Sequence, residues 1–485
     1  MNRRNIIFAF LTVGMGLSLL TCSDPKAEKS REGVQLTVLY TNDEHGWMEE
    51  TASADGAAKL MGVWMEREGY DPADEKYLIL SGGDSWTGPA ISTWFEGESM
   101  IEVMNAMQYD AAAIGNHEFD FKIAGLLDRL EQADFPYLSA NIRLKGTDSI
   151  PDYIQPYVIM SIEDVKVGII GLTTRSTSYS TFPTYVEHLD FIDYDAALRE
   201  VVPKMWEADT EVILCIAHIC FGEAQGLASV AEELGISMIG GGHCNELSVE
   251  LYNESVALIE GGWQMASYAR MDLFYDPESG EVGAIDIKTA SNEGGSPVSE
   301  ISDIVNNWVQ ATEAELGQTI GYANAEISRY STALRNLVTD SWLKAFPSAD
   351  IAITNSGGIR QPIPMGEISK GDIVGVLPFN NNIVEMKLTG AEVIDCIGNN
   401  LLMGGMTTVG GYYHADGTPM KMDSVYSVLT TDYLYVQDVT RFHVYESNPY
   451  YTGLNYHQPT VDYIVSLNTS ATDPLNNYLD HTPRR

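Results

Sequence analysis

Five short polar segments carry residue types that bind metal ions, and each directly follows an apolar run. They are residues 41–46, 82–84, 115–120, 217–218 and 240–245. Carboxylate, amide and imidazole groups without thiolates are typical ligands of Zn, Mn, Fe or Co, and they fit a structural zinc site less well. Seven candidates are too many for one tetrahedral ion and about right for two ions that share a bridging carboxylate. The candidate ligands are Asp43, His45, Asp84, Asn116, His218, His243 and Asn245.

The elements that must position these residues form an α/β pattern. From Val34 to about Tyr275, short β-branched runs alternate with longer helical patterns, which predicts a layered α/β domain. Because the carboxyl ends of strands in such a domain meet at one crevice, the polar segments are expected to converge there. Asp43 and His45 are one residue apart, as are His243 and Asn245, and in an extended backbone such pairs point the same way. The predicted strands are residues 35–40, 77–80, 111–114, 165–171, 212–217 and 237–239.

A second unit follows the first. Residues 292–297 are rich in glycine, serine and proline, which predicts a loop. Apolar residues then recur at three- and four-residue spacings from Val298 to Val309, which predicts a helix that joins two domains. We therefore expect a first domain at residues 34–292, a linker helix at 293–320 and a second domain at 321–485.

Composition limits the partners. The 485 residues carry a formal net charge of −40, which disfavours binding to nucleic-acid polymers. An anionic small-molecule substrate would need local positive charge, from bound metal or from a few arginines.

The amino terminus predicts export. Residues 1–22 combine Arg3 and Arg4 with an apolar run too short to span a membrane, which is typical of a signal peptide. The run ends before Cys22 and resembles a bacterial lipoprotein signal, so a lipid on Cys22 would be the membrane contact and residues 23–33 a tether. Plain secretion is the alternative. The remaining four cysteines are too widely spaced for a disulfide framework, and Cys244 is either a further metal ligand or a small buried side chain.

Together, the motifs resemble the calcineurin-like metallophosphoesterases, and specifically the 5′-nucleotidase family. The resemblance implies a four-layer α/β/β/α sandwich joined by a helix to a smaller α/β domain. It assigns Asp84 as the bridging ligand of two divalent ions. The first ion would also take Asp43, His45 and Asn245, and the second Asn116, His218 and His243.

Within the motif Gly115-Asn-His-Glu-Phe-Asp120, the resemblance implies that His117 and Asp120 are a catalytic pair. Two cations would clamp the phosphate and lower the pKa of a bound water. His117 would hydrogen-bond the phosphoryl oxygen and assist the leaving alkoxide, while Asp120 would fix its tautomer.

The second unit resembles the family's substrate reader. Asn355-Ser-Gly-Gly-Ile-Arg360 matches a motif whose arginine binds phosphate, and Arg329 falls near another family arginine. Phe379 and Tyr433 stand where two aromatic rings would enclose a nucleobase. Family members then carry Gly-Gly-Asp-Gly, which this chain lacks, and Asp438 is the candidate substitute for its ribose-binding aspartate.

These features predict a phosphohydrolase that removes phosphate from nucleoside 5′-monophosphates. The alternatives are a 2′,3′-cyclic nucleotide phosphodiesterase, a nucleotide-sugar hydrolase or another phosphatase on the same core. A further alternative is a non-catalytic surface lipoprotein that binds a ligand.

Overall fold

Two six-stranded sheets form the centre of the amino-terminal half. The computed structural model describes residues 33–51, 54–398 and 401–485. The first sheet has the order β14 (Glu281–Ser291), β13 (Ser267–Asp276), β1 (Val34–Thr41), β2 (Tyr77–Ser81), β3 (Ala111–Ala113) and β4 (Tyr137–Leu138). The second has the order β11 (Leu247–Tyr252), β12 (Val256–Gly261), β10 (Ile236–Gly240), β9 (Val212–His218), β7 (Val165–Thr173) and β6 (Tyr157–Ile162). The predicted strands are thus confirmed.

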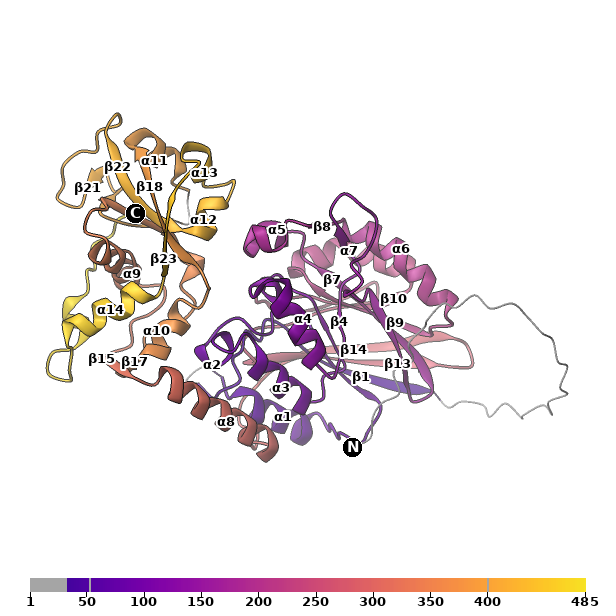
Figure 1. The fold of residues 1–485 in the computed structure, drawn as a ribbon. Helices are drawn as coiled ribbons and strands as arrows, with labels where there is room; N and C mark the ends of the chain where they lie inside the picture. Colours follow the sequence, from indigo (N-terminus) through magenta and orange to yellow (C-terminus); the bar gives the residue numbers. More distant parts are fainter. Residues whose placement is uncertain (1–32, 52–53, 399–400) are drawn as a thin grey trace.

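The two sheets pack face to face and are covered by helices on both outer sides (Figure 1). Strand β9 shows the reason: Leu214 and Ile216 enter the core between the sheets, whereas Ile213 and Cys215 pack against helices. Strands buried on both faces therefore read as continuous apolar runs. The first sheet is covered by α1 (Gly56–Arg67), α3 (Glu98–Ala106) and α4 (Lys122–Gln132), and the second by α6 (Tyr194–Glu207) and α7 (Phe221–Leu234). The four-layer α/β/β/α arrangement is confirmed.

The carboxyl-terminal half is a three-layer unit around one five-stranded sheet. Its order is β19 (Leu401–Gly404), β16 (Ile351–Asn355), β22 (Val425–Thr431), β18 (Asn382–Thr389) and β23 (Tyr450–Asn455). One face carries α9 (Thr332–Ala345) and α14 (Gln458–Leu467). The other carries α11 (Gly390–Cys396), α12 (Asp432–Val436) and α13 (Phe442–Tyr445). A small sheet of β15 (Thr319–Ala323) and β17 (Gly366–Ser369), with α10 (Lys370–Val376), completes the unit.

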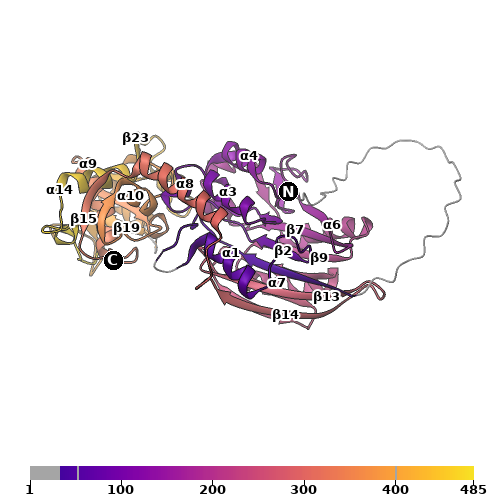
Figure 2. The same ribbon diagram turned by 90° about the horizontal axis from the view of Figure 1, so that it is seen from below.

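Helix α8 (Ser299–Leu316) runs between the two halves (Figures 1 and 2). Its predicted apolar face packs on the amino-terminal core through Ile301 and Val305. Residues 292–298 before it have no regular secondary structure, as the glycine and proline content predicts. The proposed domain boundaries stay predictions.

The predicted signal peptide, Cys22 and most of the tether lie outside the described residues. Within the described part of the chain, every helix is too short or too polar to span a bilayer.

Candidate metal and substrate site

The five polar segments converge at one edge of the amino-terminal sandwich. They follow the carboxyl ends of β1, β2, β3, β9 and β10, so both sheets contribute to one site. The backbone there is not extended, contrary to expectation: Asp43, His45, His243 and Asn245 have φ angles of 50°, 47°, 71° and 59°. The loops curl back at the sheet edge, where the amide of Asp43 bonds to the carbonyl of Gly83 at 2.9 Å. The alternation of side chains in a strand therefore does not apply.

Asp84 lies at the centre of two overlapping groups of potential ligands. One group is Asp84 with His45 and His117, and the other is Asp84 with His218 and His243. His218 Nε2 lies 2.9 Å from Asp84 Oδ2, and His45 Nε2 lies 4.0 Å from the same oxygen. His243 Nδ1 lies 3.2 Å from His218 Nε2. A carboxylate shared by two groups is the geometry that a pair of bridged cations requires.

Two histidines are oriented for metal binding by backbone carbonyls. His45 Nδ1 donates to the carbonyl of Thr87 at 2.7 Å, and His218 Nδ1 donates to the carbonyl of Gly82 at 2.9 Å. These bonds direct each Nε2 toward the carboxylates, where it can bind a cation once it carries no proton. The donor set therefore fits divalent cations.

The side chain of Asn116 supports the same conclusion. The residue is buried, its Nδ2 donates to the carbonyl of Ser180 at 3.5 Å, and its Oδ1 has no hydrogen-bond partner among the described residues. A buried carbonyl oxygen without a partner is costly unless a ligand satisfies it.

The loop around Asp84 is fixed by a buried carboxylate. Glu118 accepts hydrogen bonds from the backbone amides of Asp84 at 2.9 Å, Ser85 at 2.7 Å and Gly115 at 2.6 Å. The close approach requires glycine at 115, since a Cβ atom there would lie 2.2 Å from Asp84 Oδ1. Sequence reasoning missed Glu118 as a positioning residue, although it lies inside the quoted motif.

Electrostatics within the cluster favour added positive charge. Burial raises the pKa of Asp43 to about 6. Burial lowers the pKa of His218, but the charge of Asp84 and its hydrogen bond outweigh this and raise it to about 10. The carboxylates around His218 thus favour positive charge at this position, which a metal cation would supply.

Asn245 is the one predicted ligand that the structure does not bring into the cluster. It is exposed on the loop after β10, and its side chain makes no hydrogen bond to another described residue. Asp43, in contrast, is buried and its Oδ1 lies 3.8 Å from His45 Nε2. Its Oδ2 accepts hydrogen bonds from Asn42 Nδ2 at 2.7 Å and the amide of His243 at 2.9 Å.

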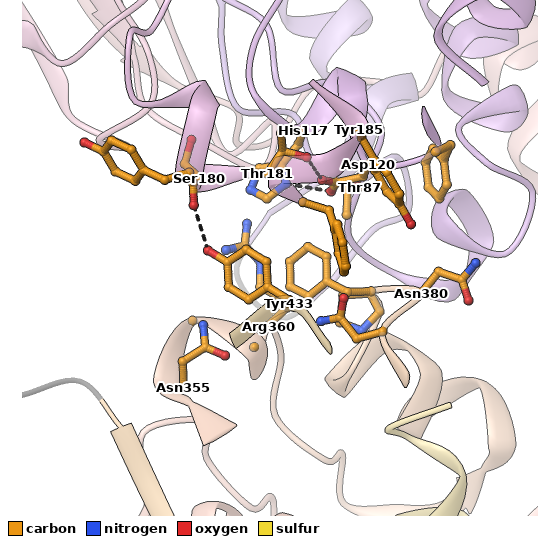
Figure 3. A pocket seen from close by; sticks show the side chains of 18 residues that line it. Thr87, His117, Asp120, Ser180, Thr181, Tyr185, Asn355, Arg360, Asn380 and Tyr433 are labelled. Atoms are coloured by element: carbon orange, nitrogen blue, oxygen red, sulfur yellow. Dashed lines mark hydrogen bonds and ion pairs between the residues drawn. The ribbon is translucent and has the colours of Figure 1, made fainter. Parts of the chain in front are cut away.

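His117 and Asp120 form the expected pair. His117 Nδ1 lies 2.7 Å from Asp120 Oδ2, and Thr181 Oγ1 donates to Asp120 Oδ1 at 2.9 Å. Burial lowers the pKa of His117, but the charges of Asp120 and Asp84 outweigh it, so the pKa is raised. The pair lines a cavity of about 330 Å³ that residues of both domains enclose (Figure 3).

Arg360 reaches from the second domain to the cluster. Its Nη2 lies 3.2 Å from His45 Nε2, and its guanidinium carbon lies 5.7 Å from the centre of the Phe379 ring. Asn355 lines the same cavity. Arg329 was expected to bind the substrate, but it contacts other residues of the chain. Its Nη1 donates to the carbonyl of Arg360 at 2.6 Å. Its guanidinium lies over the rings of Trp263 and Tyr330.

Aromatic rings line the cavity, and one of them lies beside His117 and Arg360. Phe379 stacks on His117 with ring centres 5.6 Å apart, and Tyr433 donates from its hydroxyl to the carbonyl of Tyr179 at 3.0 Å. Phe182 and Tyr185 also line the cavity and were missed. Their signal was present, since Tyr179, Phe182 and Tyr185 recur every three residues.

Asp438 does not lie at this cavity. Its side chain is fully exposed and faces His443, with Asp438 Oδ1 3.5 Å from His443 Nε2. The preceding residue, Gln437, is buried and donates from Nε2 to the carbonyl of Tyr179 at 3.0 Å. The turn after α12 therefore directs Gln437 inward and Asp438 into solvent.

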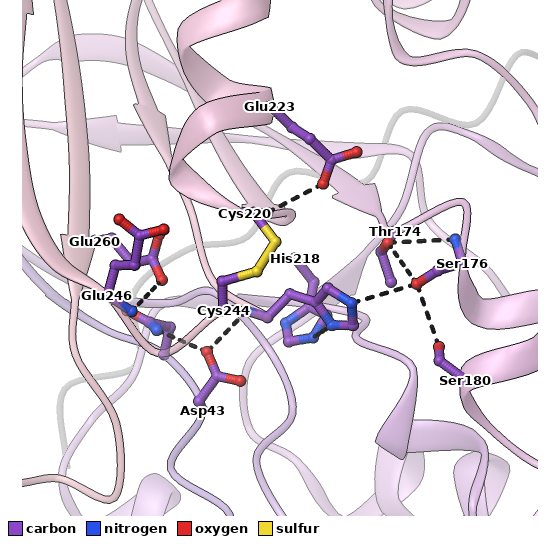
Figure 4. The surroundings of a disulfide bond; sticks show 12 residues. Asp43, Thr174, Ser176, Ser180, His218, Cys220, Glu223, Cys244, Glu246 and Glu260 are labelled. Atoms are coloured by element: carbon purple, nitrogen blue, oxygen red, sulfur yellow. Dashed lines mark hydrogen bonds between the residues drawn. A yellow bond between two sulfur atoms is a disulfide. The ribbon is translucent and has the colours of Figure 1, made fainter. Parts of the chain in front are cut away.

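Cys244 forms a disulfide with Cys220, so it is neither a metal ligand nor a small buried side chain (Figure 4). The cysteine spacing predicted no disulfide framework and left the pairing open, and the described residues contain this one disulfide. The two cysteines are 24 residues apart in sequence, but β9 and β10 are neighbours in the sheet. Cys215 and Cys396 are buried free thiols.

The structure thus has a sandwich with polar strand ends that faces a second α/β unit across a cavity. Residues 310–411 match the family model of the 5′-nucleotidase C-terminal domain. The chain is 28% identical to a 5′-nucleotidase of Vibrio parahaemolyticus over 87% of this chain and 85% of that protein. It is 29% identical to a snake venom 5′-nucleotidase of Crotalus adamanteus over 74% of this chain and 69% of that protein.

The crystal structure of a 5′-nucleotidase precursor from Thermus thermophilus superposes with a TM-score of 0.77 at 22% identity. The match covers 93% of this chain and 98% of that chain. The chain has the fold of 5′-nucleotidases, and the resemblance indicated by its motifs is confirmed.

Proposed function

We propose that this protein is a dimetal phosphohydrolase that removes phosphate from nucleoside 5′-monophosphates. The observation that carries the proposal is the position of Asp84 near His45 and near the pair His218 and His243, beside a cavity lined by aromatic rings. Similarity to 5′-nucleotidases over most of the chain supports the substrate class.

Two divalent cations, of a metal that the ligands do not specify, would be held by the clustered carboxylates, imidazoles and Asn116. When bound, they would supply Lewis acidity and activate water for attack on phosphorus. Asn245 joins this ligand set only if the loop after β10 turns inward when metal binds, and we keep it as a candidate.

The chain's own residues bind and orient the substrate. Arg360 offers a planar pair of donors to the phosphate, at the border between the ligand cluster and the cavity. Arg329 holds the Arg360 backbone in place through its carbonyl. Phe379 and Tyr433 provide faces for a base, a contact worth about 1–3 kcal/mol per base.

His117 would move the proton in the reaction. Its Nδ1 faces Asp120, which leaves Nε2 to hydrogen-bond the phosphoryl group and to donate a proton to the leaving alkoxide. The Asp120 carboxylate keeps the ring in that tautomer and stabilises its charged form.

A substrate panel tests the proposal. Purified protein loaded with Mn²⁺ is expected to release phosphate from AMP faster than from glucose 6-phosphate. The variant His117→Ala should lose most of this activity and keep its metal content. If AMP is not hydrolysed while another substrate is, or if His117→Ala keeps full turnover, the proposal is wrong.

The position of Asp438 favours a second function, which is hydrolysis of other phosphate esters by the same core. Because this carboxylate faces solvent, the cavity lacks the ribose contact expected from the motif. One reason to expect selection of nucleosides is therefore removed. UDP-glucose, 2′,3′-cyclic AMP and sugar phosphates therefore belong in the panel. Two bound metal ions with no hydrolysis of any of these substrates would favour the non-catalytic alternative.

We further propose export as a lipoprotein of the cell envelope, with secretion as the alternative. The charged start, the apolar run and Cys22 support it. Mass spectrometry of the mature protein should find a diacylglyceryl-modified cysteine at its amino terminus, and an unacylated terminus would refute the anchor.

A further inference from the structure

The disulfide joins the two segments that carry His218 and His243, the histidines that would hold the second cation. Cys220 follows His218 by two residues, and Cys244 directly follows His243. The bond therefore ties together two loops that the backbone brings from different strands, β9 and β10. Figure 4 shows the sulfur bridge beside His218 and above Asp43.

His243 is the least anchored of the three candidate histidine ligands. His45 and His218 each donate from Nδ1 to a backbone carbonyl, which orients the ring. The Nδ1 atom of His243 instead faces His218, and its Nε2 lies 3.3 Å from the hydroxyl of Ser176, a long contact. His243 is also only partly buried.

The backbone of this loop needs support as well. His243 and Asn245 both occupy the left-handed region, which costs free energy for residues other than glycine. Residues 241–246 belong to no helix or strand.

The other end of the disulfide is firmly held. Cys220 directly precedes α7, and its amide donates to Glu223 Oε2 at 3.2 Å. The amide of Gly242 donates to the carbonyl of Ile219 at 2.8 Å, beside the bridge. The disulfide thus connects the less anchored loop of the pair to a strand end and a helix start.

We propose that the Cys220–Cys244 disulfide is a positioning element for the second metal site, and this inference rests on the proposed dimetal function. It holds the His243 backbone in the orientation that lets this side chain and His218 face one cation. Supports of this kind behind a ligand typically change metal affinity by about 10- to 100-fold.

The test compares Mn²⁺ binding by metal-free protein variants. The double variant Cys220→Ser/Cys244→Ser removes the bond and keeps side chains of similar size, with serine favourable before α7. The control is Cys215→Ala, which removes a buried thiol from the same strand without touching either loop. Isothermal titration calorimetry gives the number and affinity of sites, and electron paramagnetic resonance detects coupling between two neighbouring Mn²⁺ ions.

We expect wild type and Cys215→Ala to bind two coupled Mn²⁺ ions. The double variant should bind one with near-normal affinity and the second at least about tenfold more weakly, with an uncoupled signal at low metal concentration. Two unchanged sites, or equal weakening of both, would overturn the inference. If wild type itself binds fewer than two ions, the dimetal function fails and this inference fails with it.

A second preparation covers the case in which the double variant does not fold. Folded wild type is treated with a water-soluble phosphine, which takes up water, becomes the phosphine oxide and converts the disulfide to two thiols. Iodoacetamide then caps them, which is feasible because Cys244 is exposed. The same selective loss of one Mn²⁺ site is expected, and retention of both at full affinity refutes the role.

Discussion

Removing the negative charge behind His117 should slow the reaction without removing metal. The perturbation is Asp120→Asn, which keeps the shape of the side chain that lies 2.7 Å from His117 Nδ1. A hydrogen bond to a charged group contributes about 1.5–3 kcal/mol. If that energy is expressed in the transition state, turnover falls by about 10- to 150-fold.

The pH profile gives an independent check on the same variant. Burial lowers the pKa of His117, and the charges of Asp120 and Asp84 raise it above the usual value. Without the charge at position 120, the pKa of His117 must fall. The limb of the activity profile that reports loss of the His117 proton should therefore move to lower pH.

Thr181→Val provides the matched control, because it removes one hydrogen bond to Asp120 Oδ1 at 2.9 Å and leaves the negative charge in place. Because the charge that faces His117 Nδ1 is retained, turnover is expected to fall less than in Asp120→Asn. The assay is phosphate release from AMP under saturating Mn²⁺, with metal content measured in parallel. The reasoning is refuted if Thr181→Val costs as much as Asp120→Asn, or if Asp120→Asn loses metal.

Three further outcomes follow from the site. Phe379→Ala should raise KM for AMP by about 5- to 150-fold, from about 1–3 kcal/mol of stacking, while KM for a phosphate ester without a base stays nearly constant in steady-state kinetics. Arg360→Lys should raise KM for both substrates, because a point charge replaces the planar fork of the guanidinium. KM values equal to those of the wild type would exclude a phosphate contact. Glu118→Gln should lower the free energy of unfolding by about 1–3 kcal/mol. The reason is that an amide donor would replace one of the oxygens that accept hydrogen bonds from backbone N–H groups such as that of Ser85. An unchanged denaturation midpoint would contradict this prediction.

Much of the architecture could be predicted from local patterns. Strands such as β2 and β9 are apolar on both faces because each lies between a sheet and a helical layer, so their runs stand out from the polar segments that follow. The amphipathic pattern of α8 is visible for a similar reason, since Ile301 and Val305 must face one core. Polar residues placed directly after strands are brought together by the sheets themselves, which is why Asp84 and His218 were recognisable as neighbours.

The sequence alone predicted the layered α/β pattern and the convergence of the polar strand ends, because these depend on local patterns and on strand order. The resemblance to the 5′-nucleotidase family supplied the pairing of His117 with Asp120, which lie 2.7 Å apart. Tertiary structure decided which neighbouring side chain faces inward and what lies across space from it. The left-handed turns at Asp43 and His243, the bond between Cys220 and Cys244, and the inward Gln437 beside an outward Asp438 all result from backbone turns. A turn is selected by contacts between distant segments, and residue spacing along the chain contains no record of those contacts.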